Sequence, residues 1–208
     1  MTFQLPRALR TDDDKDALGL LGRYFGASGR AYVGAEFDTW DSSGTRADDV
    51  HRFTPDDLVT MAFLSVPIRG VAARALLRDR AEEFTSLLKQ LKVDQDLVDV
   101  EEPLHDDWVG WQMMRALRSL DGVGATRGSK LLARKRPRLR PIYDSVVARV
   151  THTKREQWEP VRVALRADDR ALHQRLVHLH SEARLSSQVP PLRVLDVVAW
   201  MEGKDKGW

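Results

Sequence analysis

The chain has 208 residues, enough for one large domain or two small ones with a real hydrophobic core. It contains no cysteine, which excludes disulfides, thiolate zinc sites, iron–sulfur clusters and a cysteine nucleophile. The net charge is only +2, the N-terminus lacks the apolar centre of a signal peptide, and no apolar run approaches the ~20 residues of a membrane span. We therefore expect a soluble, cytoplasmic protein with no membrane partner.

The first 53 residues combine one helix with a long polar stretch. The pattern predicts a helix over 14–25, and residues 26–53 are rich in Gly, Ser and Asp. An aromatic alternation around Tyr32, Phe37 and Trp40 predicts a short β-hairpin or an ordered loop near residues 30–40. We expect 1–53 to form an N-terminal helix-and-loop segment and 54–208 a helical domain, with a single compact domain as the alternative.

Residues 54–208 carry the pattern of successive helices. Thr54 is suited to cap a helix and Pro55 to occupy its first position, ahead of the apolar stretch 58–64. Apolar spacing of three and four residues predicts further helices over 71–91 and 108–120, and then over about 126–135, 142–153, 156–167, 169–184 and 191–202. The sequence therefore predicts an all-α fold of about eight to ten helices.

Charge is segregated in the middle of the chain. Residues 127–140 include seven Lys or Arg and no acid, whereas residues 94–107 include seven Asp or Glu. Segregation of this kind can direct a polyanion to one face of a protein. The alternative is that the stretch 134–140 is simply a solvated basic loop.

A glycine pair precedes the basic stretch. The turn Gly122-Val123-Gly124 allows a tight bend, and the helix that follows would expose its N-terminal N–H groups to an anion. Lys130 and Arg134 are four positions apart in that helix, so both could reach the same phosphate strand. Taken alone, the turn is more typical of a tight connection between two antiparallel helices.

Asp144 opens the next helix, where an isolated aspartate ordinarily serves as the N-cap. However, the run LDGVG at 120–124, followed 22 positions after Gly122 by the run DSVVARV at 144–150, resembles the helix–hairpin–helix DNA glycosylase superfamily. That family has an LPGVG-type hairpin and then a VDTHVxRV-type segment with a catalytic aspartate. The stretch 58–77 resembles the family's early helix, break and helix, so the resemblance covers roughly residues 54–150.

The resemblance implies a DNA base-excision enzyme that hydrolyses the N-glycosidic bond of a base flipped out of double-stranded DNA, damaged or modified, without a cofactor or metal. Asp144 would be catalytic, because a fixed carboxylate stabilises an oxocarbenium-like sugar and can orient the attacking water. The residues expected to contact DNA are Gly122, Val123, Gly124, Thr126, Arg127, Lys130 and Arg134.

The chain departs from the family pattern at several positions. Thr126 stands where bifunctional glycosylase–lyases carry a nucleophilic lysine, which implies a monofunctional enzyme. Asp121 replaces a proline, Val66-Pro67 replaces a frequent glutamine, and Val146 replaces a common histidine. These changes favour the alternative of a non-catalytic helix–hairpin–helix DNA-binding module, and a helical scaffold or interaction protein is a third hypothesis. The segments FDTWDSSG, FTPDDL and KLLARKRPRL also resemble an uncharacterised bacterial family, which implies no function.

Two further groups of residues are ambiguous in the sequence. Trp108, Trp111 and Tyr143 are candidates for the walls of a base pocket, although core packing is the simpler interpretation. Three histidines, at 173, 178 and 180, have spacings that do not form a convincing helical ligand set, so we expect no metal site there.

Overall fold

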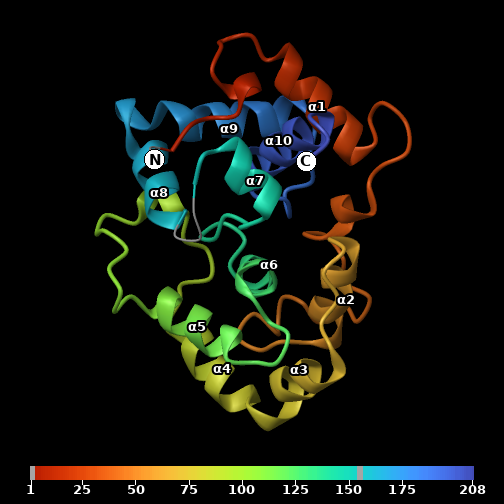
Figure 1. The fold of residues 1–208 in the computed structure, drawn as a ribbon, viewed down its shortest axis with the longest axis vertical. Coiled ribbons are helices and arrows are strands. Elements are labelled where there is room, and N and C mark those ends of the chain that lie inside the picture. The colour runs from red at the N-terminus through yellow and green to blue at the C-terminus, as the bar shows by residue number, and fades with distance from the viewer. Residues whose placement is uncertain (1–2, 154–156) are drawn as a thin grey trace.

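The computed structural model of the protein describes residues 3–153 and 157–208, which fold into helices joined by loops, with no strand in these two ranges (Figure 1). The predicted all-α fold is confirmed. The α helices are α1 (Lys15–Phe25), α2 (Pro55–Phe63), α3 (Gly70–Arg74), α4 (Ala81–Lys89), α5 (Val109–Arg118), α6 (Ala125–Lys135), α7 (Ser145–Val150), α8 (Trp158–Arg166), α9 (Ala171–Glu182) and α10 (Pro191–Asp205).

The helices form two groups on either side of α6. Helices α1, α7, α9 and α10 lie together at one end of the molecule, near both termini, whereas α3 and α4 lie at the other end (Figure 1). Helix α10 contacts α1, α7 and α9, and α6 contacts α2 and α5. Within the described ranges, no helix combines the length and apolar character needed to cross a membrane.

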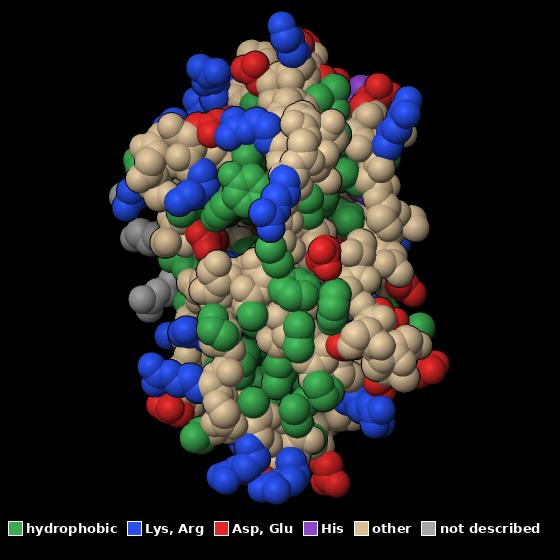
Figure 2. All heavy atoms as spheres, turned by 90° about the vertical axis from the view of Figure 1, so that its right-hand side faces the viewer, with side chains coloured by type: hydrophobic (Ala, Val, Ile, Leu, Met, Phe, Trp, Pro, Cys, Tyr) green, Lys and Arg blue, Asp and Glu red, His purple; other side chains and the backbone are tan. Residues whose placement is uncertain are grey.

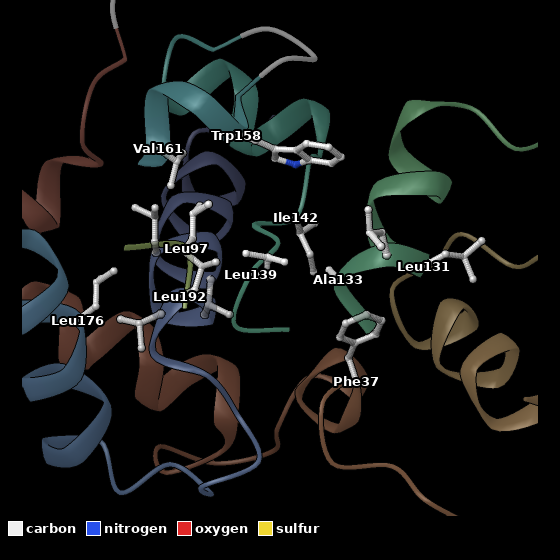
Figure 3. Close-up of a cluster of buried hydrophobic side chains, with 14 of the residues drawn as sticks. Phe37, Leu97, Leu131, Ala133, Leu139, Ile142, Trp158, Val161, Leu176 and Leu192 are labelled. Atoms are coloured by element: carbon white, nitrogen blue, oxygen red, sulfur yellow. The ribbon is translucent and has the colours of Figure 1, made fainter. Parts of the chain in front are cut away.

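One hydrophobic core runs through both predicted segments of the chain. Buried residues from Ala8 to Met201 belong to the same cluster. Figure 3 shows Phe37 of the N-terminal segment directed toward Ala133 of α6, with Leu192 of α10 in the same region. The backbone N–H groups of Arg7 and Ala8 also donate to the carboxylate of Glu202. The described part of the segment 1–53 therefore shares its core with the segment 54–208.

Of the two alternatives predicted near residues 30–40, a short β-hairpin or an ordered loop, the hairpin is wrong. This stretch contains the 3₁₀ helix η2 (Val33–Glu36) and no strand. The aromatic alternation has another origin, because Phe37 is buried in the core and Tyr32 stacks on Tyr24 of α1, with 5.5 Å between the ring centroids. The aromatic pattern is thus produced by two separate packing contacts.

Two predicted helices differ from those in the structure. The stretch 71–91 is divided into α3, a π-helical turn η3 (Ala75–Asp79) and α4. The N–H of Arg80 donates to the carbonyl of Ala75, five residues earlier, and this wider turn shifts the register. Helix α7 is shorter than the predicted 142–153 because it begins only after its N-cap, Asp144. The predicted start of the following helix at residue 156 lies outside the described residues.

Candidate functional site

The glycine turn connects α5 to α6. Gly122 has a φ of +70°, in the left-handed region, and a Cβ there would lie 3.1 Å from Cδ of Arg69. Val123 is buried and anchors the turn in the core, while Gly124 is exposed and forms the N-cap of α6 without a side-chain cap. Because the first N–H groups of a helix have no partner within it, this end of α6 is available to an external acceptor.

The first turn of α6 contributes Thr126 and Arg127. The Thr126 side chain is half-buried. The guanidinium of Arg127 donates from Nε to the carbonyl of Pro67 and from Nη1 to the carbonyl of Gly122, both at 3.1 Å. Arg127 therefore ties the turn to the loop between α2 and α3, and a contact with phosphate remains a prediction for both residues.

Lys130 and Arg134 share a face of α6, as predicted, but that face points inward. The Lys130 side chain is only 6% exposed, and the Arg134 side chain is fully buried. Arg134 donates to the carboxylate of Asp57 and to the carbonyls of Phe37 and Trp40. The interpretation that this pair reaches a phosphate strand is thus contradicted, because protein acceptors already occupy the Arg134 guanidinium.

Asp144 has two roles in the structure. Asp144 is the N-cap of α7, and its Oδ1 accepts a hydrogen bond from the N–H of Val146 at 2.9 Å. Its Oδ2 lies 3.0 Å from Nζ of Lys130, and the Asp144 side chain keeps 15% of its surface exposed. The hydroxyl of Ser129 accepts from the N–H of Tyr143 and fixes the segment before Asp144. Helix α6 therefore positions both the carboxylate and the ammonium beside it.

Lys130 and Asp144 lie on the wall of a cavity of about 590 Å³. This volume is within the range of ordinary small-molecule sites, roughly 300–1,000 Å³. Aromatic rings from four different parts of the chain line it: Tyr24, Tyr32, Phe37, Phe63 and Trp200. Three of these rings contact one another, since Tyr32 stacks on Tyr24 and Trp200 meets both of them edge-on. The cavity also includes Val66, Arg193 and Asp196.

Sequence reasoning missed most of this wall. The spacing of Tyr32 and Phe37 predicts a hairpin or an ordered loop, and it does not indicate a cavity wall. Tyr24 and Trp200 lie in ordinary amphipathic helices that are far apart in the sequence, and only the contact between α1 and α10 brings them together. No local pattern could have identified them.

The basic stretch after Lys130 is largely internal, which contradicts the predicted charge-segregated surface. Nζ of Lys135 donates to Asp57 and to the carbonyl of Asp49. The Arg136 guanidinium donates to the carbonyls of Leu88, Leu91 and Val50. These side chains donate hydrogen bonds to backbone carbonyls that would otherwise lack partners. Their positive charges therefore lie inside the protein and not on its surface.

The tryptophans proposed as pocket walls do not line the cavity. Trp111 stacks on Trp158, with 4.2 Å between the ring centroids, and Trp108 meets Trp158 edge-on. The guanidinium of Arg140 lies 3.5 Å from the Trp108 ring centroid. Tyr143 is likewise outside the cavity wall. In the part of the chain that is described, no group of three or more His, Cys, Asp or Glu side chains could hold a metal ion.

The face that carries α2 and α3 has an uneven surface. Figure 2 shows hydrophobic side chains gathered over the middle and lower part of this face, with Lys and Arg side chains above them, at their sides and at the lower end. The exposed hydrophobic residues on these two helices include Val59 and Val71. Positive charge on this face therefore lies around the hydrophobic side chains and is not confined to one end of the molecule (Figure 2).

Comparison with known proteins gives one result. No curated protein and no solved structure matches this chain. A model described as "Family of unknown function (DUF6308)" matches residues 17–203, which include the glycine turn, Lys130, Asp144 and the cavity wall. The chain belongs to this family of unknown function, DUF6308.

Proposed function

We propose that this protein acts on double-stranded DNA, damaged or modified, as a monofunctional base-excision enzyme of the helix–hairpin–helix type. The observation that carries the proposal is the position of Asp144. Its carboxylate lies 3.0 Å from the Lys130 ammonium, on the wall of an aromatic cavity, at the end of the segment that follows the glycine turn and α6.

The DNA backbone would be held at the glycine turn. The exposed N-cap Gly124 leaves the N–H groups of the first turn of α6 available, and such groups bind phosphate oxygens. The target nucleotide would then rotate out of the duplex at a cost of a few kcal/mol, and its base would enter the cavity. Stacking on Tyr24, Tyr32 or Trp200 would offset part of that cost.

Hydrolysis requires little covalent chemistry from the protein. As the bond between C1′ and the base nitrogen lengthens, the sugar becomes oxocarbenium-like, and the ionised Asp144 stabilises that charge. Water adds to C1′ and transfers a proton to Asp144, while the base leaves with the bonding electron pair and takes up a proton. Thr126 offers no amine, and the Lys130 ammonium is held in an ion pair with Asp144, so the product is an abasic site in an intact strand.

A second candidate is a non-catalytic DNA-binding module. Both oxygens of Asp144 already have protein partners, Val146 N–H and Lys130 Nζ, as a purely structural N-cap would. In that case the protein would bind DNA through the glycine turn, and substitution of Asp144 would not affect its function.

The first test is binding at about 100 mM salt, a concentration at which non-specific phosphate contacts are already weakened. Two duplexes are compared, one intact and one with a central non-cleavable abasic analogue. We expect clear preference for the abasic duplex. Equal binding to both would favour the non-catalytic module, and binding to neither would favour the helical scaffold.

The second part of the test uses Asp144→Asn, which keeps an N-cap oxygen for α7. The variant should retain its preference for the abasic duplex but lose base release roughly 10²- to 10⁴-fold on any modified duplex that the wild type cleaves. Asp99→Asn is the control, because it removes an exposed carboxylate paired with Arg170. Unchanged base release by Asp144→Asn would contradict the catalytic role.

A further inference from the structure

A second carboxyl group, that of Asp196 on α10, lines the same cavity as Asp144. Asp196 is almost completely buried. Its Oδ2 accepts two hydrogen bonds, from the N–H of Ile142 at 2.9 Å and from Nη1 of Arg193 at 2.5 Å. Within the described ranges Oδ1 accepts no hydrogen bond, and this oxygen is not fully buried. Oδ1 therefore remains accessible to an occupant of the cavity.

The charge around Asp196 is not balanced. Arg193 donates to both oxygens of Asp38 through Nε and Nη2 and reaches Asp196 only through Nη1, so one guanidinium serves two carboxylates. Tyr24 of α1 also interacts electrostatically with Asp196, and Lys130, Asp144 and Lys204 line the same cavity. Burial raises the pKa of Asp196 to about 7, against the opposing effects of Arg193 and the Ile142 N–H, while the negative charge of Asp38 adds to the rise.

We propose that Asp196 selects the occupant of the cavity, by accepting a hydrogen bond at Oδ1 from the amino group of a nitrogen heterocycle. The inference rests on the proposed function and specifies its substrate class, a base that bears an exocyclic amino group. An ionised carboxylate can only accept, so it favours an amino group over a carbonyl oxygen at the same place. The aromatic rings of the wall can stack on either base, and stacking does not distinguish an amino group from a carbonyl oxygen.

The substitution Asp196→Asn should reverse the selection. Because Ile142 and Arg193 both donate to the Oδ2 position, the amide oxygen must occupy that position, and the amide NH₂ must face the cavity. An acceptor toward the cavity is thus exchanged for a donor, which favours a carbonyl oxygen on the base.

The experiment measures dissociation constants at pH 8 for two duplexes with an uncleavable 2′-fluoro-arabino nucleotide that carries adenine or hypoxanthine. Adenine carries an amino group at C6, whereas hypoxanthine carries a carbonyl oxygen there and a hydrogen on the adjacent N1. The ratio of the hypoxanthine constant to the adenine constant should fall at least about tenfold in Asp196→Asn relative to the wild type. The free-energy cost of opening the base pair cancels when the two ratios are compared, because the wild type and the variant bind the same duplexes.

Asp38→Asn is the matched control. Asp38 belongs to the same Arg193 cluster but does not line the cavity, so this substitution should leave the ratio unchanged. If Asp196→Asn does not fold, the wild type is measured at pH 6 and pH 8. Protonated Asp196 presents a donor at Oδ1, so the ratio should be lower at pH 6.

Two outcomes would overturn the proposal in different ways. The first outcome is that the wild type prefers the abasic duplex but has the same ratio as Asp196→Asn, which would mean that Asp196 does not select the base. Where that variant does not fold, equal wild-type ratios at pH 6 and pH 8 would lead to the same conclusion. If the wild type shows no preference for the abasic duplex, the proposed function fails and the inference fails with it.

Discussion

Arg140 shows how one residue can carry a large energetic cost. Its guanidinium is completely buried, and none of its three nitrogens has a hydrogen-bond partner in the described part of the chain. It is enclosed by the rings of Trp108 and Trp158, at 3.5 and 4.6 Å from its central carbon. Burial lowers the pKa of Arg140 well below the usual value. Stacking on indole rings is favourable, but loss of hydration costs several kcal/mol.

We therefore expect Arg140→Met to raise the free energy of unfolding by about 1–4 kcal/mol, because methionine fills the space without a charge. Arg140→Ala should be about 2–5 kcal/mol less stable than Arg140→Met, through the cavity that it leaves. Urea denaturation measures both. Arg138→Met is the control, since the exposed Arg138–Asp96 pair contributes at most about 1 kcal/mol. A decrease of more than about 1 kcal/mol in Arg140→Met would mean that stacking outweighs desolvation.

At the scale of residues, the sequence correctly predicted which side chains share a helix face but not whether that face is exposed to solvent. The spacing that placed Lys130 and Arg134 on one face of α6 was correct, but a helical period cannot say whether that face meets solvent or protein. Arg134 is internal because loop carbonyls and Asp57, remote in the sequence, need donors. Asp196 carried no signal, since its importance depends on Arg193 and Ile142 reaching the same oxygen.

At the scale of elements, the connection between α5 and α6 is the feature on which DNA binding would depend. Gly122→Ala should lower the free energy of unfolding by about 1–2 kcal/mol, because an L-residue is strained at a φ of +70°. Gly124→Ala is the matched control, as Gly124 has ordinary backbone angles and no atom within 4 Å of an added Cβ. It should cost less than about 1 kcal/mol. Denaturation of both variants measures the difference, and equal stabilities would show that the turn can relax.

Elements were predictable where the signal is local. Thr54 and Pro55 mark the start of α2, and Thr54 forms a capping box with Asp57 there. The division of 71–91 was not predictable from apolar spacing, because a π-helical turn adds one residue without disturbing the pattern on either side. The hairpin alternative near residues 30–40 failed because Tyr32 and Phe37, which flank the 3₁₀ helix η2, pack against α1 and in the core, not against a partner strand.

For the whole molecule, the boundary at residue 53 can be tested directly. Phe37 fills the core, its carbonyl and that of Trp40 accept from the buried Arg134, and Asp38 pairs with the buried Arg193. Without residues 1–53, two buried guanidinium groups would lose acceptors. Removing one partner of a buried ion pair costs about 3–5 kcal/mol, a large part of the 5–15 kcal/mol that typically stabilises a domain.

We therefore expect the fragment 54–208 to show no cooperative urea transition by circular dichroism, whereas the full chain unfolds in one. Asp38→Asn in the full chain serves as the control, because it weakens one of these contacts but keeps the core side chains of the N-terminal segment. It should fold with reduced stability. A cooperative transition and native-like helix content in the fragment would instead establish 54–208 as an independent domain. The cavity would then lose Tyr24, Tyr32 and Phe37 from its wall without loss of the fold, so the fragment could serve to measure what those rings contribute to binding.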